Sequence, residues 1–231
     1  MLSQNRDLTI RDRVIDALTT NETSWFRDRA PWQLLRHTFL PQYVEALRSG
    51  RTSKIRIWSA ASSTGQEAYS IAMTIDRYLR DHMIRDVTLE QFEIFATDIS
   101  QTVLDIAVRG RYDSISIMRG LPDLEKSMYF QRHGMTWEVD ERIRSIVRFQ
   151  RFNLQDSFIL LGKFQLVFCR YVMIYFSDDL KRDIINKLSR CLTDEGVLLI
   201  GASELNTLID RHFELKDTTH GSYYLKKGER A

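Results

Sequence analysis

The strongest constraint on the fold is an alternation of strand-like and helix-like segments across residues 54–108. Residues 54–61 alternate apolar and polar side chains as a strand does, and small residues then lead into a helical run at 66–82. A second strand-like segment, FEIFATD, ends at Asp98 and is followed by another helical run. The order strand, tight turn, helix, strand predicts a parallel sheet with crossover helices.

The same pattern resumes in the second half of the chain. We expect strands at 147–152, 164–169 and 196–201, with a helix at 178–192 before the last of them. The segments FELKD and SYYLKK near the C-terminus flank a turn-like THG and predict an antiparallel hairpin. A parallel sheet that ends in an antiparallel hairpin is typical of the methyltransferase variant of the dinucleotide-binding fold. We therefore expect a doubly wound α/β fold, the Rossmann-like class I methyltransferase fold.

Three segments stand apart from this alternation. Residues 111–146 carry RGLP and the strand-like MTWEV, and they predict a small inserted β-subdomain at about 111–148. Residues 10–19 have apolar side chains on one helical face and predict a short amphipathic helix. A further helix is expected at 32–48.

The composition argues against several classes of protein. The net charge of +2, from 33 basic and 31 acidic residues, gives no basic footprint for nucleic acid. No stretch approaches the roughly 18 apolar residues that membrane insertion needs, and the start of the chain lacks the apolar core of a signal peptide. Cys169 and Cys191 cannot build a disulfide framework, and the five histidines match no metal or triad spacing. We expect a cytoplasmic protein without a bound metal.

The loop after the first strand is the first candidate for a binding site, because ligands of open α/β sheets bind at the carboxyl ends of the strands. Residues 59–67, SAASSTGQE, are mostly small and let the backbone approach a ligand closely. The loop matches neither GxxxxGK[ST] nor GxGxxG. Two interpretations of Glu67 remain open: it contacts the ligand, or it closes a capping box with Thr64 and only satisfies backbone donors.

Asp98 is the second candidate, at the end of the second strand. An acidic residue there can accept both hydroxyls of a ribose, and the alternative is that it caps the helix that begins near Ser100. Asn153 and Leu154 follow a third strand, and CRYVMIYF at 169–176 follows a fourth. Their alternative role is ordinary strand ends and core. The side chains expected in packing are Val172, Met173, Ile174 and Phe176.

Eight motifs, in a fixed order and spacing over about residues 19–225, carry a resemblance to a known family. They are NETSWFRD (21–28), WSAASSTGQEAYSIAM (58–73), FATDIS (95–100), GRY (110–112), RGLP (119–122), FNLQD (152–156), CRYVMIYF (169–176) and GASE (201–204). With these motifs the chain resembles the CheR-type chemotaxis receptor methyltransferases. That family methylates glutamate side chains of receptors with S-adenosylmethionine.

The resemblance implies a cofactor site for S-adenosylmethionine, with S-adenosylhomocysteine as the product and no metal. The residues at the family's cofactor-contacting positions are Asn21, Thr23, Arg27, Glu67, Asp98, Asn153, Leu154, Arg170 and Tyr171. Arg27 and Tyr175 stand at positions near the transferred methyl group, where a catalytic role is implied. The implied methyltransferase domain covers residues 21–231, with the insertion at about 111–148 and a short N-terminal helix in residues 1–20.

The chain departs from the family at four places: the segment before Asn21, Gln66 where the family often has Glu, Ala68 where it often has Pro, and Tyr171. The family usually has a basic helical domain of several dozen residues before the position of Asn21, so the helix in residues 1–20 is a remnant of that domain or a substitute for it. Tyr171 stands where the family usually has Asn, and its ring either stacks on the cofactor or obstructs it. The insertion grips a receptor's tether peptide in some members; here it either does the same or covers the sheet edge.

The chemistry of the implied reaction agrees with these residue types. A glutamate carboxylate, with a pKa of about 4.3, is already a nucleophile at neutral pH. Displacement at a sulfonium methyl group needs alignment and desolvation rather than a general base. Arg27 can hold the carboxylate through a bidentate pair, and Tyr175 can orient the methyl donor or the acceptor oxygen.

We therefore expect a protein-glutamate O-methyltransferase that acts on a chemoreceptor or a related signalling protein. Two alternatives remain. One is a methyltransferase for another acceptor, such as a small carboxylic acid. The other is a non-catalytic module that binds S-adenosylmethionine or docks a partner.

Overall fold

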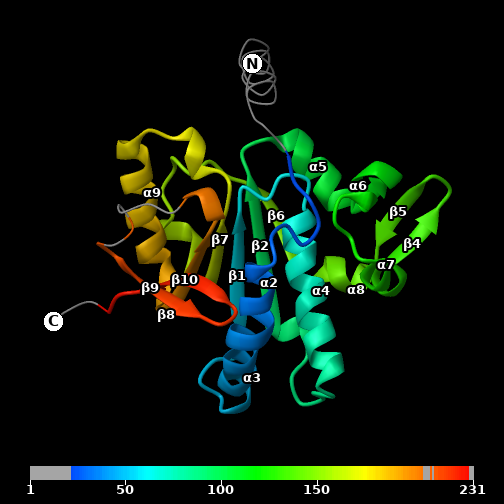
Figure 1. Ribbon diagram of the computed structural model, residues 1–231, viewed down its shortest axis with the longest axis horizontal. Helices are drawn as coiled ribbons and strands as arrows, with labels where there is room; N and C mark the ends of the chain where they lie inside the picture. Colours follow the sequence, from blue (N-terminus) through cyan, green and yellow to red (C-terminus); the bar gives the residue numbers. More distant parts are fainter. Residues whose placement is uncertain (1–21, 205–208, 210, 229–231) are drawn as a thin grey trace, which may run out of the picture.

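A mostly parallel sheet of seven strands, in the order β6-β2-β1-β7-β8-β10-β9, forms the centre of the protein (Figure 1). The computed structural model describes residues 22–204, 209 and 211–228. The strands are β1 (Ile55–Ala60), β2 (Phe92–Asp98), β6 (Val147–Arg151), β7 (Phe164–Cys169), β8 (Leu192–Ile200), β9 (Phe213–Thr218) and β10 (Gly221–Lys226). Neighbours from β6 to β8 pair in parallel, whereas β10 is antiparallel to both β8 and β9. This arrangement confirms the predicted fold class.

Successive side chains of the central strands feed two separate cores, as the period of two in a strand requires. Ile57 belongs to the core that contains Ile75 of α4 (Gln66–Asp81), and the next residue, Trp58, belongs to the core that contains Leu188 of α9 (Asp178–Cys191). Each of these side chains is almost completely buried. Burial of one large apolar side chain contributes about 1.5–3 kcal/mol, so the two cores hold helices against both faces of the sheet.

The first described helical segment differs from the single helix expected at 32–48. It consists of α2 (Ala30–Leu34), a π-helical turn η1 (Leu35–Phe39) and α3 (Leu40–Arg48). The π-helical turn comes just before Pro41, whose ring cannot lie against the carbonyl group four residues earlier in a regular α-helix. The wider turn therefore lets the segment continue through the proline.

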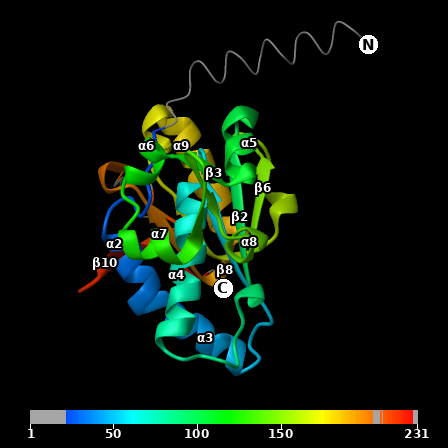
Figure 2. The ribbon, with the colours of Figure 1, turned by 90° about the vertical axis from the view of Figure 1, so that its right-hand side faces the viewer.

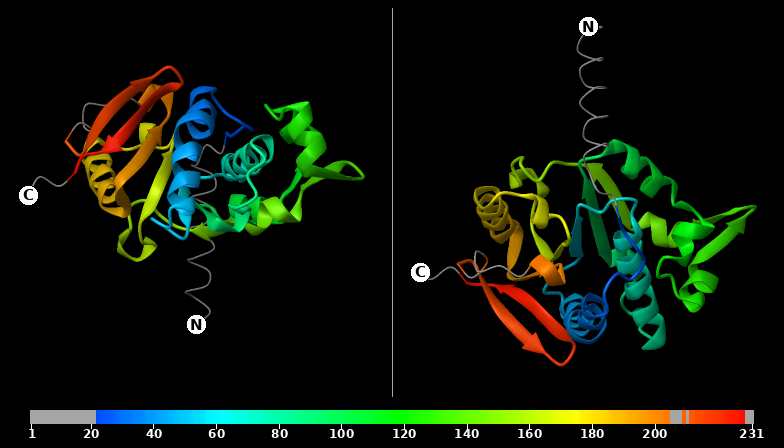
Figure 3. Two further views of the ribbon diagram at one scale, coloured as in Figure 1. Left: turned by 90° about the horizontal axis from the view of Figure 1, so that it is seen from below. Right: turned by 45° about the horizontal axis from the view of Figure 1, so that its top comes forward.

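A second sheet, β3-β5-β4, lies at the opposite end of the molecule from the β9–β10 hairpin, with α2 and α3 between them (Figure 3). Its elements are β3 (Arg111–Asp113), α6 (Ser114–Met118), α7 (Asp123–Tyr129), β4 (Phe130–His133), β5 (Thr136–Val139) and α8 (Glu141–Ser145). They lie within the segment where we expect the insertion. Asp76 of α4, which is 2% exposed, accepts hydrogen bonds from Tyr129 at 2.9 Å and pairs with Arg142 at 2.7 Å. These contacts hold α7 and α8 against α4 (Figure 2).

The remaining elements are short or connect the strands. They are η2 (Leu89–Gln91), α5 (Gln101–Arg109), η3 (Ile159–Leu161), η4 (Met173–Tyr175) and η5 (Ala202–Glu204). The strand expected at 196–201 begins earlier, at Leu192, directly after α9. The pairing of β7 with β8 shifts between Phe164 and Leu166, and this irregularity accommodates the turn-like residues 193–196 inside the strand.

The amphipathic helix at 10–19 lies outside the described residues. Among the helices that are described, none is both long enough and apolar enough to cross a bilayer.

The RGLP motif connects the N-terminal segment to the second sheet through a close backbone contact. Gly120 has a φ of +93°, and a Cβ atom there would lie 2.5 Å from the carbonyl oxygen of Trp25. The neighbouring Arg119 carbonyl accepts a hydrogen bond from the Trp25 amide at 2.9 Å. Any side chain at position 120 would therefore separate the two segments.

We expect Gly120→Ala to lower the free energy of unfolding by about 2–4 kcal/mol, because it adds a steric clash to the cost of a left-handed backbone. Gly134→Ala is the matched control. Its φ is +62° and its Cβ would meet nothing within 4 Å, so only the backbone cost of about 1–2 kcal/mol applies. Urea denaturation of both variants measures the difference, and equal losses would contradict the clash.

Candidate active site

A cavity of about 280 Å³ lies where the strand order reverses. The chain passes from β1 to β2 and β6 on one side, then crosses to β7 on the other side of β1. The loops after these four strands line the cavity, together with residues 22–27. This is the place where open α/β sheets bind ligands. The predicted site residues that line the cavity are Thr23, Arg27, Glu67, Asp98, Asn153, Leu154, Arg170, Tyr171 and Tyr175. Asn21 lies outside the described residues.

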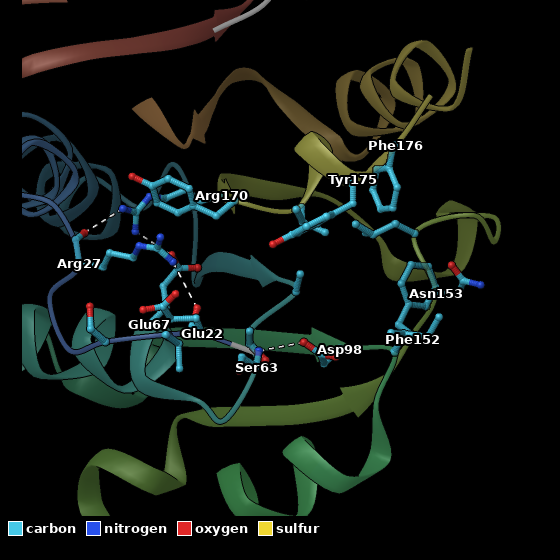
Figure 4. A pocket seen from close by; sticks show the side chains of 18 of the residues that line it. Glu22, Arg27, Ser63, Glu67, Asp98, Phe152, Asn153, Arg170, Tyr175 and Phe176 are labelled. Carbon is cyan, nitrogen blue, oxygen red and sulfur yellow. Dashed lines mark hydrogen bonds and ion pairs between the residues drawn. The ribbon is translucent and has the colours of Figure 1, made fainter. Parts of the chain in front are cut away.

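Asp98 organises the floor of the cavity from the end of β2 (Figure 4). Its carboxylate accepts the Ser63 amide at 2.8 Å and the Ser100 amide at 3.0 Å, and the side chain is almost completely buried. Ser100 itself caps α5, because its Oγ accepts the Val103 amide. Asp98 is therefore not the helix cap, and its carboxylate faces the cavity from the end of β2.

Glu67 makes side-chain contacts rather than a capping box. Its Oε1 accepts a hydrogen bond from Ser59 Oγ, and its Oε2 pairs with Arg170 Nη1, both at 2.8 Å. The helix cap is Gly65, with a φ of +93°, and it makes no side-chain hydrogen bond. The capping-box interpretation of Thr64 and Glu67 is therefore wrong, because the carboxylate turns toward a buried cation instead of its own backbone.

Arg170 is the buried cation of the site, with a side chain only 1% exposed. Besides Glu67, its Nη2 donates to the Arg27 carbonyl at 2.8 Å and to Asp28 at 2.6 Å. Burial alone would lower the pKa of Arg170, but the negative charges of Glu67 and Asp28 outweigh it and raise the pKa above its ordinary value. The guanidinium therefore stays charged and joins three segments of the chain.

Tyr171 packs against the same cluster from the next position. Its hydroxyl donates to Asp28, and the guanidinium carbon of Arg27 lies 3.7 Å from the centre of its ring. Burial, followed by the hydrogen bond to Asp28, raises the pKa of Tyr171, so the hydroxyl remains a donor. Stacking of this kind contributes about 0.5–2 kcal/mol, which favours one orientation of the Arg27 side chain.

The backbone at Tyr171 has a conformation that suits the Asn implied here by the family resemblance. Its φ is +60°, in the left-handed region that asparagine tolerates and bulky residues rarely adopt. A residue other than Gly, Asn or Asp costs about 1–2 kcal/mol in this conformation. The contacts with Asp28 and Arg27 offset that cost in this chain.

The opposite wall of the cavity comes from the loops after β6 and β7. In Figure 4, Arg27 and Glu67 lie on one side, and Asn153 and Tyr175 lie on the other, with the Tyr175 hydroxyl directed toward the cavity. Tyr175 is 59% exposed, so it stands at the mouth. The expected packing roles are confirmed for Met173, which is buried, and for Val172 and Phe176, which pack against the core and also line the cavity. The expectation is wrong for Ile174, which is 48% exposed.

Sequence reasoning assigned no role to two acidic residues of this region. Asp28 pairs with Arg170 and accepts a hydrogen bond from the Tyr171 hydroxyl. Hydrophobic periodicity does not single out this residue, and its position next to Arg27 is its only signal in the sequence. Glu204 accepts backbone amides of the loop after β7 from behind the cavity. Its one signal was its place in the GASE motif.

Comparison with known proteins identifies the family. The family described as CheR methyltransferase, SAM binding domain, matches residues 21–222. The chain belongs to this family. Chemotaxis protein methyltransferase Cher2 of Pseudomonas putida is 43% identical over 220 residues, which cover 94% of this chain and 78% of that protein. Chemotaxis protein methyltransferase 1 of Pseudomonas aeruginosa is 42% identical with the same coverage, and that of Vibrio cholerae is 41% identical over 97% of this chain and 78% of its own.

The residues of the cavity fit the S-adenosylmethionine that the family binds. A buried carboxylate, Asp98, stands at the end of β2, where a ribose is held in dinucleotide-binding folds. The hydroxyl of Ser62, which is 1% exposed and lines the cavity, has no hydrogen-bond partner within the described residues. A buried polar group without a partner is costly, and a polar ligand in the cavity would satisfy it.

The Glu67–Arg170 pair predicts a measurable contribution to stability. We expect Glu67→Gln to lower the free energy of unfolding by about 2–3 kcal/mol, below the 3–5 kcal/mol typical of a broken buried pair because Asp28 still faces Arg170. Glu93→Gln is the matched control: that residue is 28% exposed and pairs with Arg56 at 3.2 Å. Its loss should stay under about 1 kcal/mol in urea denaturation. Equal losses in the two variants would show that the buried pair stabilises no more than a surface pair.

Proposed function

We propose that this protein transfers the methyl group of S-adenosylmethionine to glutamate carboxylates of a chemoreceptor or a related signalling protein in the cytoplasm, releasing S-adenosylhomocysteine without a metal. Membership of the CheR methyltransferase family supports the cofactor, and the names of the relatives support a role in chemotaxis. The choice of a carboxylate acceptor rests on the charge and the contacts of Arg27.

Arg27 presents a positive charge to the cavity that no carboxylate neutralises among the described residues. Among the described residues, its contacts are a hydrogen bond to the Glu22 carbonyl at 3.2 Å and the stacking on Tyr171. Arg170, by contrast, is already paired with Glu67 and Asp28. A guanidinium with free donors holds a carboxylate through two parallel hydrogen bonds, so Arg27 suits a glutamate acceptor.

The rest of the cavity lining agrees with a carboxylate rather than an amine. Among the described residues, no histidine lines the cavity. Two of its acidic members, Glu67 and Asp98, are already hydrogen-bonded, and the third, Glu22, is exposed to solvent. A protonated amine would need a base before it could attack, whereas a carboxylate needs only position and the exclusion of water. Tyr175 stands at the mouth, where it can orient the acceptor oxygen.

The cofactor supplies a methyl group made electrophilic by a sulfonium. We assign Asp98 to the ribose hydroxyls, and Thr23, Asn153, Leu154, Arg170 and Tyr171 to the wall around it. Glu67 acts by holding Arg170 in place, at 2.8 Å. The assignment of Asn21 rests on the family resemblance alone.

Asp98→Ala tests the ribose assignment. We expect the affinity for S-adenosylhomocysteine, measured by calorimetry, to fall about 10- to 100-fold, the range for losing a hydrogen bond to a charged group. Asp105 is an exposed carboxylate on α5 that accepts a hydrogen bond from Gln101, and Asp105→Ala should bind as wild type. Thermal melts check that both variants are folded. Unchanged affinity in Asp98→Ala would remove this residue from the ribose site.

Arg27 and the acceptor are tested by transfer of a labelled methyl group to a receptor fragment. We expect incorporation that mild base releases as methanol, because a glutamyl ester hydrolyses and an N-methyl group does not. Arg27→Ala should lower kcat/KM about 100-fold through misplacement of the acceptor, and Arg27→Lys should recover little because it cannot bind in a bidentate manner. Arg29→Ala, an exposed neighbour, is the control.

Two results would contradict the proposal. Base-stable label would indicate another acceptor group. Tight binding of S-adenosylmethionine with no transfer to any carboxylate acceptor would indicate a binding module without turnover.

A further inference from the structure

Glu204 is a buried carboxylate behind the cavity that has no role in the function proposed so far. It lies in η5, the short turn after β8, and is 6% exposed. No ion pair to Glu204 is found within residues 22–204, 209 and 211–228. Its partners are instead four backbone amides, so the charge is held by N–H donors alone.

The four amides come from the loop after β7 and from the end of β8. Oε2 accepts the amides of Tyr171 at 2.5 Å and Gly201 at 2.8 Å. Oε1 accepts the amides of Met173 at 2.8 Å and Ile174 at 3.3 Å. Hydrogen bonds from backbone N–H groups to a carboxylate are stronger than those between neutral groups, so one side chain determines the path of the whole loop.

The loop alternates between two sides. Tyr171 and Tyr175 face the cavity, whereas Met173 and Ile174 border the space on the Glu204 side. Gly201 lets the carboxylate come this close, since a Cβ atom there would lie 2.6 Å from Oε2 and 2.9 Å from Cδ1 of Tyr171. Gly201 and Glu204 therefore act together, because the glycine gives the carboxylate the space it needs to reach the backbone amides.

The loop also holds an unfavourable conformation. Tyr171 has a φ of +60°, which a tyrosine adopts only when its surroundings enforce it. The Glu204 carboxylate binds the amide of that same residue. Tyr171 in turn supports the Arg27 guanidinium, and Tyr175 stands at the cavity mouth.

We propose that Glu204 is a positioning residue for methyl transfer: its carboxylate holds the 171–175 loop so that Tyr171 and Tyr175 present their side chains to the reacting groups. This inference rests on the proposed function. Asp98, which we assign to the ribose hydroxyls, stands at the end of β2, whereas Glu204 acts on the loop after β7, where Tyr171 is one part of the wall around the cofactor. Loss of the carboxylate should therefore affect the chemical step more than the binding of the cofactor.

Glu204→Gln is the primary test, because the variant keeps the size of the side chain but turns an NH2 group toward backbone N–H donors. We expect kcat to fall about 100-fold, the effect of a small misplacement of reacting groups, while the Kd for S-adenosylhomocysteine changes less than about tenfold. Glu204→Asp, which keeps the charge, should recover part of kcat. Glu195→Gln, an exposed glutamate of β8, should behave as wild type.

Hydrogen exchange of backbone amides gives a readout that does not depend on the acceptor. In Glu204→Gln the amides of Tyr171, Met173, Ile174 and Gly201 should exchange at least about tenfold faster, and those of β1 and β2 should not change. This experiment remains decisive if wild type transfers no methyl group to glutamate. In that case the proposed acceptor fails, while faster exchange confined to the loop still supports the role of Glu204.

Two outcomes would overturn the inference. One is wild-type kcat together with wild-type exchange in Glu204→Gln. The other is a loss of kcat that the loss of cofactor binding or of folded protein accounts for fully, with no recovery in Glu204→Asp, because a merely structural role predicts that result.

Discussion

The buried guanidinium of Arg170 is the group on which the arrangement of the active site depends. A cation with a side chain 1% exposed requires nearby carboxylates, and it finds Glu67 at the start of α4 and Asp28 in the N-terminal segment. It also donates to the Arg27 carbonyl. One side chain after β7 therefore places the helix that follows β1 and the segment that carries Arg27 around the same cavity.

A second carboxylate works from the other side of the same loop. Arg170 and Tyr171 face the segment of residues 22–28, while Glu204 collects the amides of Tyr171 and Met173 behind them. The loop after β7 is thus held between a cation–carboxylate cluster and a carboxylate–amide cluster. Residues that must lie within a fraction of an ångström of reacting atoms benefit from support of this kind, because loops are otherwise mobile.

Tyr171 adopts a backbone conformation that its residue type normally disfavours. Its backbone conformation suits asparagine, and the tyrosine is tolerated because its ring and hydroxyl make contacts that an asparagine could not. The two outcomes expected for this ring, stacking on the cofactor or obstruction of the site, both stay predictions. The ring stacks on Arg27 and so becomes part of the cavity wall.

The sequence by itself determined the class of fold and the edge of the sheet that carries the site. Period-two alternation in FEIFATD and KIRIWSAA defines both faces of a buried strand, and polar residues at strand ends, such as Asp98, must meet at one edge of a parallel sheet. Tertiary structure alone decided the partners. Glu67 could equally have capped its own helix by local rules, yet it pairs with a residue 103 positions away. Such pairs depend on strand order and on the burial of charge, and the periodicity of apolar residues along the sequence determines neither.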